Sequence, residues 1–305
     1  MRILFDGDIL VFRCGFAAEK NHWFLTVGEE SFEFDYKKDA VAKLDELLPG
    51  IRTREEGRDY ALWSERVVEP VAHALHLVNQ TITETLRVLE ASEYDLTVFL
   101  SGEGNYRYKV ATTRPYKGNR DQAHRPTHEH AIKDFIRSRF NTVVSDGEEA
   151  DDAMGIAQTR IGPLESVIVT LDKDLDMIPG LKYNFVNRVP YSITEDQGHY
   201  NFCKQLLTGD STDNIPGLPK IGHAKAAKLL ENIPQEDMML EVALAYMRHA
   251  PKDDWLEYLR EQGQLLWIRQ QPNEMWEPDE DVMALGSTED YYDERANEES
   301  LRELF

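Results

Sequence analysis

Short apolar runs recur along this chain and predict the strands of one sheet. Arg2–Phe5 is the first, Leu96–Leu100 the second, and Ser166–Leu171 the most apolar of them. Asn141–Ser145 and Lys182–Asn187 are further candidates. Short runs of this kind, without polar alternation, are typical of parallel strands buried on both faces. We therefore expect an α/β fold with a central, mostly parallel sheet.

Other segments carry the periodicity of a hairpin or of helices. Trp23–Val27 and Ser31–Tyr36 alternate apolar and polar residues on either side of a Gly-Glu-Glu turn, which predicts a β-hairpin. Residues 37–59 resemble a surface insertion. Val67–Leu89 and Tyr200–Leu207 have the spacing of amphipathic helices. Strands that alternate with helices in this way favour the same α/β class.

The stretch Gly209–Gly222 combines two carboxylates with a run of glycines and prolines. Asp210 and Asp213 are three residues apart, so one helical turn would place both on the same face, where they suit a shared metal ion. The glycines and prolines that follow forbid a continued helix and predict a hairpin that opens the helix Ala224–Leu230. Backbone N–H groups at such a hairpin suit a phosphate oxygen. An acidic turn before an ordinary helical hairpin would explain the same residues.

Acidic residues gather in four separated clusters. These are Asp6; Glu149, Asp151 and Asp152; Asp172 and Asp174; and Asp210 and Asp213. Two clusters follow predicted strands and two lie at predicted helix starts, and ligands of open α/β sheets bind outside the carboxyl ends of the strands. Crowded carboxylates are unfavourable without a cation, and all-oxygen ligands suit Mg²⁺ or Mn²⁺. Two such ions can act together in phosphodiester hydrolysis. We interpret Asp8, by contrast, as a helix cap.

Basic and aromatic residues interleave in the segment 105–139, which has nine Lys or Arg against three Asp or Glu. Its members include Tyr106, Arg107, Tyr108, Lys109, Tyr116, Lys117 and Arg120. Cations neutralise phosphates, and aromatic faces stack bases without sequence preference. The pattern therefore predicts a grip on a single strand of nucleic acid, although a solvated basic face has the same composition.

The composition places the basic segment in an otherwise acidic protein. The 305 residues have a formal net charge of −22, and residues 271–305 alone contain twelve Asp or Glu against two Lys or Arg. Cys14 and Cys203 are far apart, which suits a reducing compartment. No apolar run reaches the length of a membrane span, and no signal-peptide pattern opens the chain. We expect an intracellular, cytoplasmic protein.

Five motifs in this order resemble the 5′→3′ exonuclease and flap endonuclease family, which includes phage 5′-nucleases and the exonuclease domain of bacterial DNA polymerase I. They are Phe-Asp-Gly at 5–7, Tyr-Lys-Gly-Asn-Arg at 116–120, Glu-Ala-Asp-Asp at 149–152, Asp-Lys-Asp at 172–174 and Gly-Asp-Ser-Thr-Asp-Asn-Ile-Pro-Gly at 209–217. The resemblance covers most of residues 1–230. It implies a PIN-like α/β nuclease core with a helical arch, followed by a C-terminal helix-hairpin-helix module that binds DNA.

The resemblance also implies a role for each matching residue. The eight carboxylates of the four clusters match metal ligands for two Mg²⁺ or Mn²⁺ ions. Lys117 and Arg120 match cations that contact the scissile phosphate and act in catalysis. The expected DNA-binding residues are Arg107, Tyr116, Lys117, Arg120, Gly217, Lys220 and Gly222. A potassium ion at the hairpin is a further expectation from the family.

The same resemblance suggests boundaries and partners. We expect a nuclease core at 1–187 with its arch at about 103–139, a helix-hairpin-helix region at 188–270, and an acidic tail at 271–305. The partners would be DNA with a 5′ single-stranded end, flap or nick, and replication proteins through the tail, with the protein itself a monomer. The expected function is hydrolysis of DNA, or of RNA in hybrids, from 5′ ends and at 5′ flaps, in primer removal or DNA processing.

Two positions depart from the family pattern. The second strand of the family usually ends in Asp, where this chain has Ser101, and Glu103 is the nearest carboxylate that could replace it. The family hairpin commonly has glycine where Lys220 stands. The first departure leaves open a catalytically weakened, structure-specific DNA-binding protein. A PIN-type ribonuclease is the other alternative, although the duplex-binding hairpin argues against it.

Overall fold

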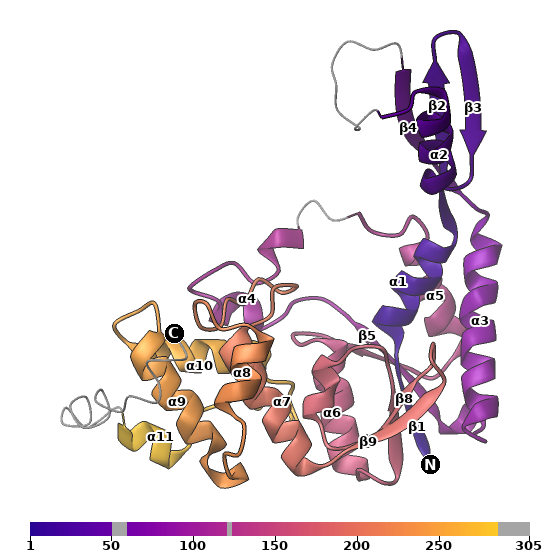
Figure 1. Ribbon diagram of the computed structural model, residues 1–305. Coiled ribbons are helices and arrows are strands. Elements are labelled where there is room, and N and C mark those ends of the chain that lie inside the picture. The colour runs from indigo at the N-terminus through magenta and orange to yellow at the C-terminus, as the bar shows by residue number, and fades with distance from the viewer. Residues whose placement is uncertain (51–59, 121–123, 286–305) are drawn as a thin grey trace. The chain divides into compact units, whose positions relative to one another are not determined.

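The structure is a computed structural model that describes residues 1–50, 60–120 and 124–285 (Figure 1). The chain divides into two compact units. The first comprises Met1–Ile9, Leu89–His124 and Phe140–Phe305, and the second comprises Leu10–Val88 and Arg125–Arg139. These compact units are not the domains expected from the sequence, whose boundaries came from the family resemblance. Those boundaries stay predictions. Among the described residues, no helix is long and apolar enough to cross a membrane.

The first unit is built on a six-stranded sheet in the order β6-β5-β1-β7-β8-β9. Its strands are β1 (Arg2–Asp6), β5 (Leu96–Ser101), β6 (Thr142–Ser145), β7 (Ser166–Val169), β8 (Gly180–Asn184) and β9 (Val189–Ile193). All neighbouring pairs are parallel except β8 with β9. This confirms the α/β class and the mostly parallel central sheet. The antiparallel edge strand β9 was not predicted.

Burial explains why these short runs form strands. All four residues of β7 are buried, and β1 is buried from Ile3 to Asp6. β1 lies between β5 and β7, with Phe5 opposite Val98 on one side and Val169 on the other. Carboxyl ends of parallel strands share one edge of the sheet, so the residues after β1, β5 and β7 meet there.

Helices cover the sheet and build a core beside it. The helices of this unit are α4 (Arg107–Val110), α6 (Ala150–Ile161), α7 (Glu195–Thr208), α8 (His223–Leu229), α9 (Met238–His249), α10 (Trp255–Leu266) and α11 (Glu280–Leu285). Short 3₁₀ turns are η1 (Glu93–Asp95), η2 (Gly118–Arg120), η3 (Asp174–Met177) and η4 (Gln235–Asp237). α6 packs on β1, β5 and β7, while α7, α9 and α10 pack on one another around Phe202 and Tyr258.

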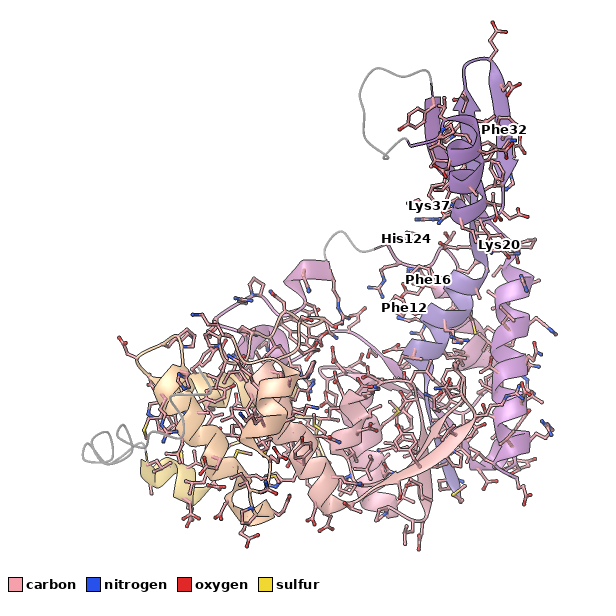
Figure 2. All side chains as sticks on the ribbon, viewed as in Figure 1. Phe12, Phe16, Lys20, Phe32, Lys37 and His124 are labelled. Carbon is pink, nitrogen blue, oxygen red and sulfur yellow. The ribbon has the colours of Figure 1, made fainter. Side chains whose placement is uncertain are left out.

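The second unit holds a three-stranded antiparallel sheet, with β2 between β3 and β4. Its elements are β2 (Glu19–Val27), β3 (Glu30–Phe34), α2 (Lys37–Leu47), β4 (Tyr60–Val68), α3 (Val71–Val88) and α5 (Glu129–Arg139), with most of α1 (Gly7–Ala17). The predicted hairpin is confirmed. The helix predicted for Val67–Leu89 is confirmed as α3, but Val67 and Val68 belong to β4, a strand that was not predicted. α2 covers one face of the sheet and packs on β2 and β3 (Figure 1), and its buried residues are Ala40 and Leu44. Phe12 and Phe16 lie one turn apart on α1, with ring centroids 6.1 Å apart (Figure 2).

Candidate functional site

Carboxylates from the four acidic clusters lie close enough to raise one another's pKa. Burial raises the pKa of Asp6 to about 7, and Asp172 adds to this rise by repulsion. Burial also raises the pKa of Asp151 well above its usual range, with repulsion from Asp6, Asp172 and Glu149 adding to it. These side chains come from the end of β1, the start of α6 and the loop after β7. One edge of the sheet therefore carries a concentrated negative charge.

The turn at 210–213 extends this cluster. Burial raises the pKa of Asp174 to about 7, and repulsion from Asp172, Asp210 and Asp213 contributes. Asp174 accepts a hydrogen bond of 2.9 Å from Gln205, which ties the Asp174 carboxylate to helix α7. Repulsion thus links carboxylates from all four clusters named from the sequence. Crowded carboxylates of this kind are stabilised by a cation.

Asp6 also caps helix α1, a role that the sequence analysis gave to Asp8. Its carboxylate accepts a hydrogen bond of 3.0 Å from the Ile9 N–H, which caps α1, and another of 2.7 Å from the Thr170 hydroxyl. Asp8 accepts instead from the Ser101 N–H at 3.1 Å. The prediction that Asp8 caps this helix is therefore wrong, because α1 begins at Gly7, two residues before the Ile9 start that a cap at Asp8 implies.

Asp210 and Asp213 lie in a turn, so the predicted helical turn is wrong. Asp210 pairs with Ile215 through backbone hydrogen bonds of 2.9 and 2.8 Å, and its carboxylate accepts from the Thr212 N–H. Asn214 has a φ of 62°, in the left-handed region that ends a regular helix. Both carboxylates still lie near enough to Asp174 to raise its pKa by repulsion.

The segment 115–120 is tied to this turn by several hydrogen bonds. The Lys117 N–H donates to the Asp213 carbonyl at 2.9 Å, and Asn119 donates to the Ser211 carbonyl at 2.8 Å. The Arg120 guanidinium donates to the Thr212 carbonyl and to the Asp213 carboxylate. The basic segment and the acidic turn, about 95 residues apart in the chain, therefore lie side by side.

Lys117 lies between two carboxylates of the cluster. Its ammonium forms ion pairs with Glu149 and, at 3.5 Å, with Asp213. Burial alone would lower the pKa of Lys117, but the two carboxylates outweigh it and raise the pKa, so the side chain stays charged. The side chain of Arg120 is 44% exposed, which leaves part of its guanidinium open to solvent. Both cations are therefore held at the site, and Arg120 is the more accessible.

Tyr116 is not placed for stacking on a base. Its side chain is 4% exposed, and its hydroxyl donates to Asp213 at 2.7 Å and to Glu149 at 3.1 Å. It belongs to the core and joins the two carboxylates beside Lys117. Tyr108 is 59% exposed and packs edge-on against Tyr116, with ring centroids 5.5 Å apart. Tyr108 is thus the most exposed of the aromatic residues Tyr106, Tyr108 and Tyr116.

Arg107 is also buried, which corrects its assignment to DNA. Its side chain is 3% exposed and donates to both oxygens of Asp152, at 2.6 and 2.9 Å. It donates further to the carbonyls of Leu265 and Trp267. Asp152 also accepts from the Arg269 N–H and the Glu149 N–H. With its oxygens engaged in this way, Asp152 holds segments together, unlike the other carboxylates of the cluster.

The hairpin offers fewer free donors than the sequence suggested. The Gly217 N–H donates to Gln262 at 3.1 Å, and its carbonyl accepts from Tyr258, so its predicted contact with phosphate is wrong for this conformation. A Cβ at Gly217 would lie 2.2 Å from the Gly209 nitrogen, which explains the glycine. Lys220 and Gly222 are exposed, so their predicted contacts with DNA stay open.

Ser101, at the end of β5, caps α6. Its hydroxyl accepts a hydrogen bond of 3.0 Å from the Ala150 N–H, the first residue of that helix. Glu103 is exposed, and its own N–H donates to Asp146. The serine therefore replaces the carboxylate expected in the family with a neutral cap beside the cluster.

The donor set suits a divalent cation, but the side chains are not arranged around one. Among the described residues, no three acidic, His or Cys side chains stand together in a metal-binding arrangement. Glu149 and Asp213 are engaged by Lys117, and Asp6 by Ile9 and Thr170. The oxygen-only ligands and the mutual repulsion of the carboxylates nevertheless fit Mg²⁺ or Mn²⁺.

Curated proteins with similar sequences include two nucleases. The chain is 30% identical over 172 residues to the 5′-3′ exonuclease of Buchnera aphidicola subsp. Schizaphis graminum, covering 52% of this chain and 59% of that protein. It is 26% identical over 179 residues to the flap endonuclease Xni of Colwellia psychrerythraea, covering 53% and 61%. The resemblance to the 5′→3′ exonuclease and flap endonuclease family is confirmed. This chain spans about three fifths of each relative's length.

Two further comparisons add little to the family resemblance. No family model matches the chain. A solved structure of the T5 D15 protein, co-crystallized with metal ions, aligns with 87% of this chain and 85% of its own, at 18% sequence identity and a TM-score of 0.49. We draw no conclusion from a likeness at that level.

Proposed function

We propose that this 5′-nuclease relative is a metal-dependent enzyme that hydrolyses phosphodiester bonds of DNA from 5′ ends and at 5′ flaps. One observation carries the proposal: carboxylates from four segments form a single cluster, with Lys117 and Arg120 held against it. A negatively charged site that binds cations and has fixed basic side chains beside it matches the needs of phosphoryl transfer. The sequence likeness to a 5′-3′ exonuclease and a flap endonuclease supports the reaction.

The cluster would hold two Mg²⁺ or Mn²⁺ ions. We assign Asp6, Asp151 and Asp172 to the deeper part of the cluster. The side facing the turn would comprise Glu149, Asp174, Asp210 and Asp213. When bound, such ions supply Lewis acidity toward a phosphodiester oxygen. Asp152 has a supporting role instead, because Arg107 engages both of its oxygens.

The chain's own cations would hold the phosphate. Arg120 is partly exposed and can donate to a phosphate oxygen, while Lys117 supplies a second positive charge from the edge of the cluster. Glu149 would be among the residues that hold the ions, and the Lys117 ammonium now paired with it would then be able to donate to the phosphate. Tyr108, Lys220 and Gly222 are exposed and are our further candidates for contact with DNA. From the family resemblance we extend the proposal in three ways. The enzyme would also cleave RNA in hybrids, would act in primer removal, and would bind a potassium ion at a helix-hairpin-helix module.

The test is cleavage of a 5′-labelled flap duplex with Mg²⁺ or Mn²⁺, beside an Asp172→Asn, Asp174→Asn double variant and an EDTA control. Asp176→Asn is the matched control, since Asp176 lies in the same loop but bonds Tyr191 outside the cluster. We expect products from the normal protein and from Asp176→Asn alone. Intact flaps with the normal protein in both metals would overturn the proposal.

Ser101 gives a specific reason to keep a second function. A neutral cap at the end of β5 removes one carboxylate that the family has, which favours a protein that binds flaps and cleaves them weakly. Tight binding of the flap without cleavage in Mg²⁺ would support this alternative. A PIN-type ribonuclease would instead cut single-stranded RNA and leave the flap duplex intact.

A further inference from the structure

A separate cavity of about 690 Å³ lies among the C-terminal helices of the first unit. Its lining comes from α7, η4, the start of α9 and the segments around Trp267 and Trp276. The lining residues are Asp196, His199, Phe202, Gln235, Glu236, Met239, Trp267, Trp276, Glu277 and Asp279. None of the acidic cluster's carboxylates is among them, so the cavity is distinct from the candidate active site.

Aromatic rings form one wall of this cavity. Phe202 lies edge-on to Trp267 and Trp276, with centroid distances of 4.9 and 5.5 Å. Phe202 is buried, whereas both tryptophans are partly exposed. Trp276 is seated on Gly263, where a Cβ would lie 2.0 Å from the indole ring. The wall is therefore a fixed arrangement of aromatic rings, whose faces attract cations through the ring quadrupole.

Four carboxylates surround the same wall, two of them hydrogen-bonded to the described chain and two not. Glu277 accepts from Arg260 and Gln264, and Asp279 accepts from the Val282 N–H. Asp196 and Glu236 are exposed and form no side-chain hydrogen bond or ion pair with the rest of the described chain. Two carboxylates are thus available to a ligand.

The lining also lacks any positive charge of its own. Among its described residues there is no lysine or arginine. His199 bonds Gln235, and burial lowers its pKa, so the imidazole is neutral at pH 7. Aromatic and methionine surface would contact an alkyl chain, while the open carboxylates would meet its charged end. The volume is that of a site for a small ligand or one side chain.

We propose that this cavity binds an ammonium or guanidinium group carried on an alkyl stem. Two sources offer that chemistry: the lysine or arginine side chain of a basic peptide, and a free polyamine. The proposal does not depend on nuclease activity, because the residues involved are separate from the acidic cluster.

The experiment is calorimetric titration of the full-length protein without metal. One arm uses acetyl-Gly-Arg-Gly-amide, with the citrulline peptide as its neutral match, and the other uses spermidine. We expect saturable binding of one cationic ligand, accompanied by a change in tryptophan fluorescence. The citrulline peptide should bind at least about tenfold more weakly, since it keeps the stem and loses the charge.

Variants locate the binding. Asp196→Asn with Glu236→Gln should weaken it at least about tenfold, and Trp276→Leu should weaken it while every carboxylate remains. Glu195→Gln changes the neighbouring acid outside the cavity and should leave the affinity unchanged, as should Asp172→Asn with Asp174→Asn. Thermal melts would confirm that each variant folds.

Each outcome decides the proposal. Binding of the peptide alone identifies a protein side chain as the source, and binding of spermidine alone identifies a polyamine. The proposal is overturned if neither ligand binds, or if the Asp196 and Glu236 substitutions leave the affinity of a bound ligand unchanged.

Discussion

Arg107 donates two parallel hydrogen bonds to Asp152, at 2.6 and 2.9 Å, and both side chains are buried. The pair joins α4 to the start of α6, and Arg107 also donates to the carbonyls of Leu265, in the last turn of α10, and of Trp267, just after that helix. A buried pair of this geometry fixes segments far apart in the chain, and loss of one partner leaves the other charge without compensation.

The first prediction concerns that ion pair. Arg107→Met should lower the free energy of unfolding by about 3–5 kcal/mol, because Asp152 would remain buried and charged without its partner. Urea denaturation followed by circular dichroism measures the change. Lys109→Met is the matched control on the same helix, exposed in the structure, and should stay within about 0.5 kcal/mol of the normal protein. A loss below about 1 kcal/mol for Arg107→Met would contradict the structural role.

A second prediction follows from the position of Lys117. Its ammonium occupies carboxylate oxygens of Glu149 and Asp213 that a divalent ion would otherwise use. Lys117→Met should therefore raise the affinity for Mn²⁺ in the absence of DNA by about three- to tenfold, since one competing charge is removed. Titration followed by electron paramagnetic resonance measures free Mn²⁺ directly.

The same substitution should also slow cleavage, because a positive charge near the phosphate is lost. Opposite effects on Mn²⁺ affinity and on rate distinguish Lys117 from a residue that only maintains the fold. Slower cleavage together with an unchanged or weaker Mn²⁺ affinity would show that Lys117 does not compete with the ions.

A third prediction concerns Lys220, which has a φ of 62°. A side chain with a Cβ is strained in this left-handed region, whereas glycine is not. Lys220→Gly should raise the free energy of unfolding by about 0.5–1 kcal/mol, the strain relief being partly offset by a more flexible unfolded chain. Lys220→Ala keeps the strain and should not stabilise the protein.

Binding to duplex DNA gives the second readout for Lys220. Both variants lose the charge, so both should bind DNA more weakly, with a shallower dependence on salt, if Lys220 contacts a phosphate. Equal affinity for DNA across the normal protein and both variants would remove Lys220 from the interface.

The strands and the meeting of the acidic clusters could be predicted from the sequence, for a simple physical reason. Short buried runs such as Ser166–Val169 specify parallel strands, and such strands bring their carboxyl ends to one edge. The residues after β1 and β7 then had to be neighbours.

The roles of Arg107 and Tyr116 could not be predicted in the same way. Whether a basic or aromatic side chain points outward depends on distant partners, and Arg107 donates to a carbonyl 158 residues further along the chain. α4 has only four residues, too few for a periodic pattern to distinguish its buried side from its exposed side. The sequence left a helical turn and an acidic turn open at Asp210, because a spacing of three residues suits both.

The final prediction uses pH. Lys182 lies in β8 with its side chain fully buried, and its ammonium donates to Gln158 at 2.8 Å. Burial lowers its pKa to about 7, against an ordinary value near 10.5. Between these two values the unfolded chain binds one proton more than the folded chain, so this group makes stability rise with pH.

Urea denaturation at pH 7.5 and at pH 9.5 should reveal this dependence. Lys182→Met removes the titrating group and should reduce the slope of unfolding free energy against pH by about 1 kcal/mol per unit. The change in unfolding free energy at a single pH is harder to interpret, because Lys182→Met also removes the hydrogen-bond donor of Gln158. Lys228→Met, on the exposed side of α8, should keep the slope of the normal protein. If Lys182→Met and the normal protein have the same slope of unfolding free energy against pH, Lys182 is not the source of the pH dependence. Lys182 would then have to stay protonated in the folded protein across this range.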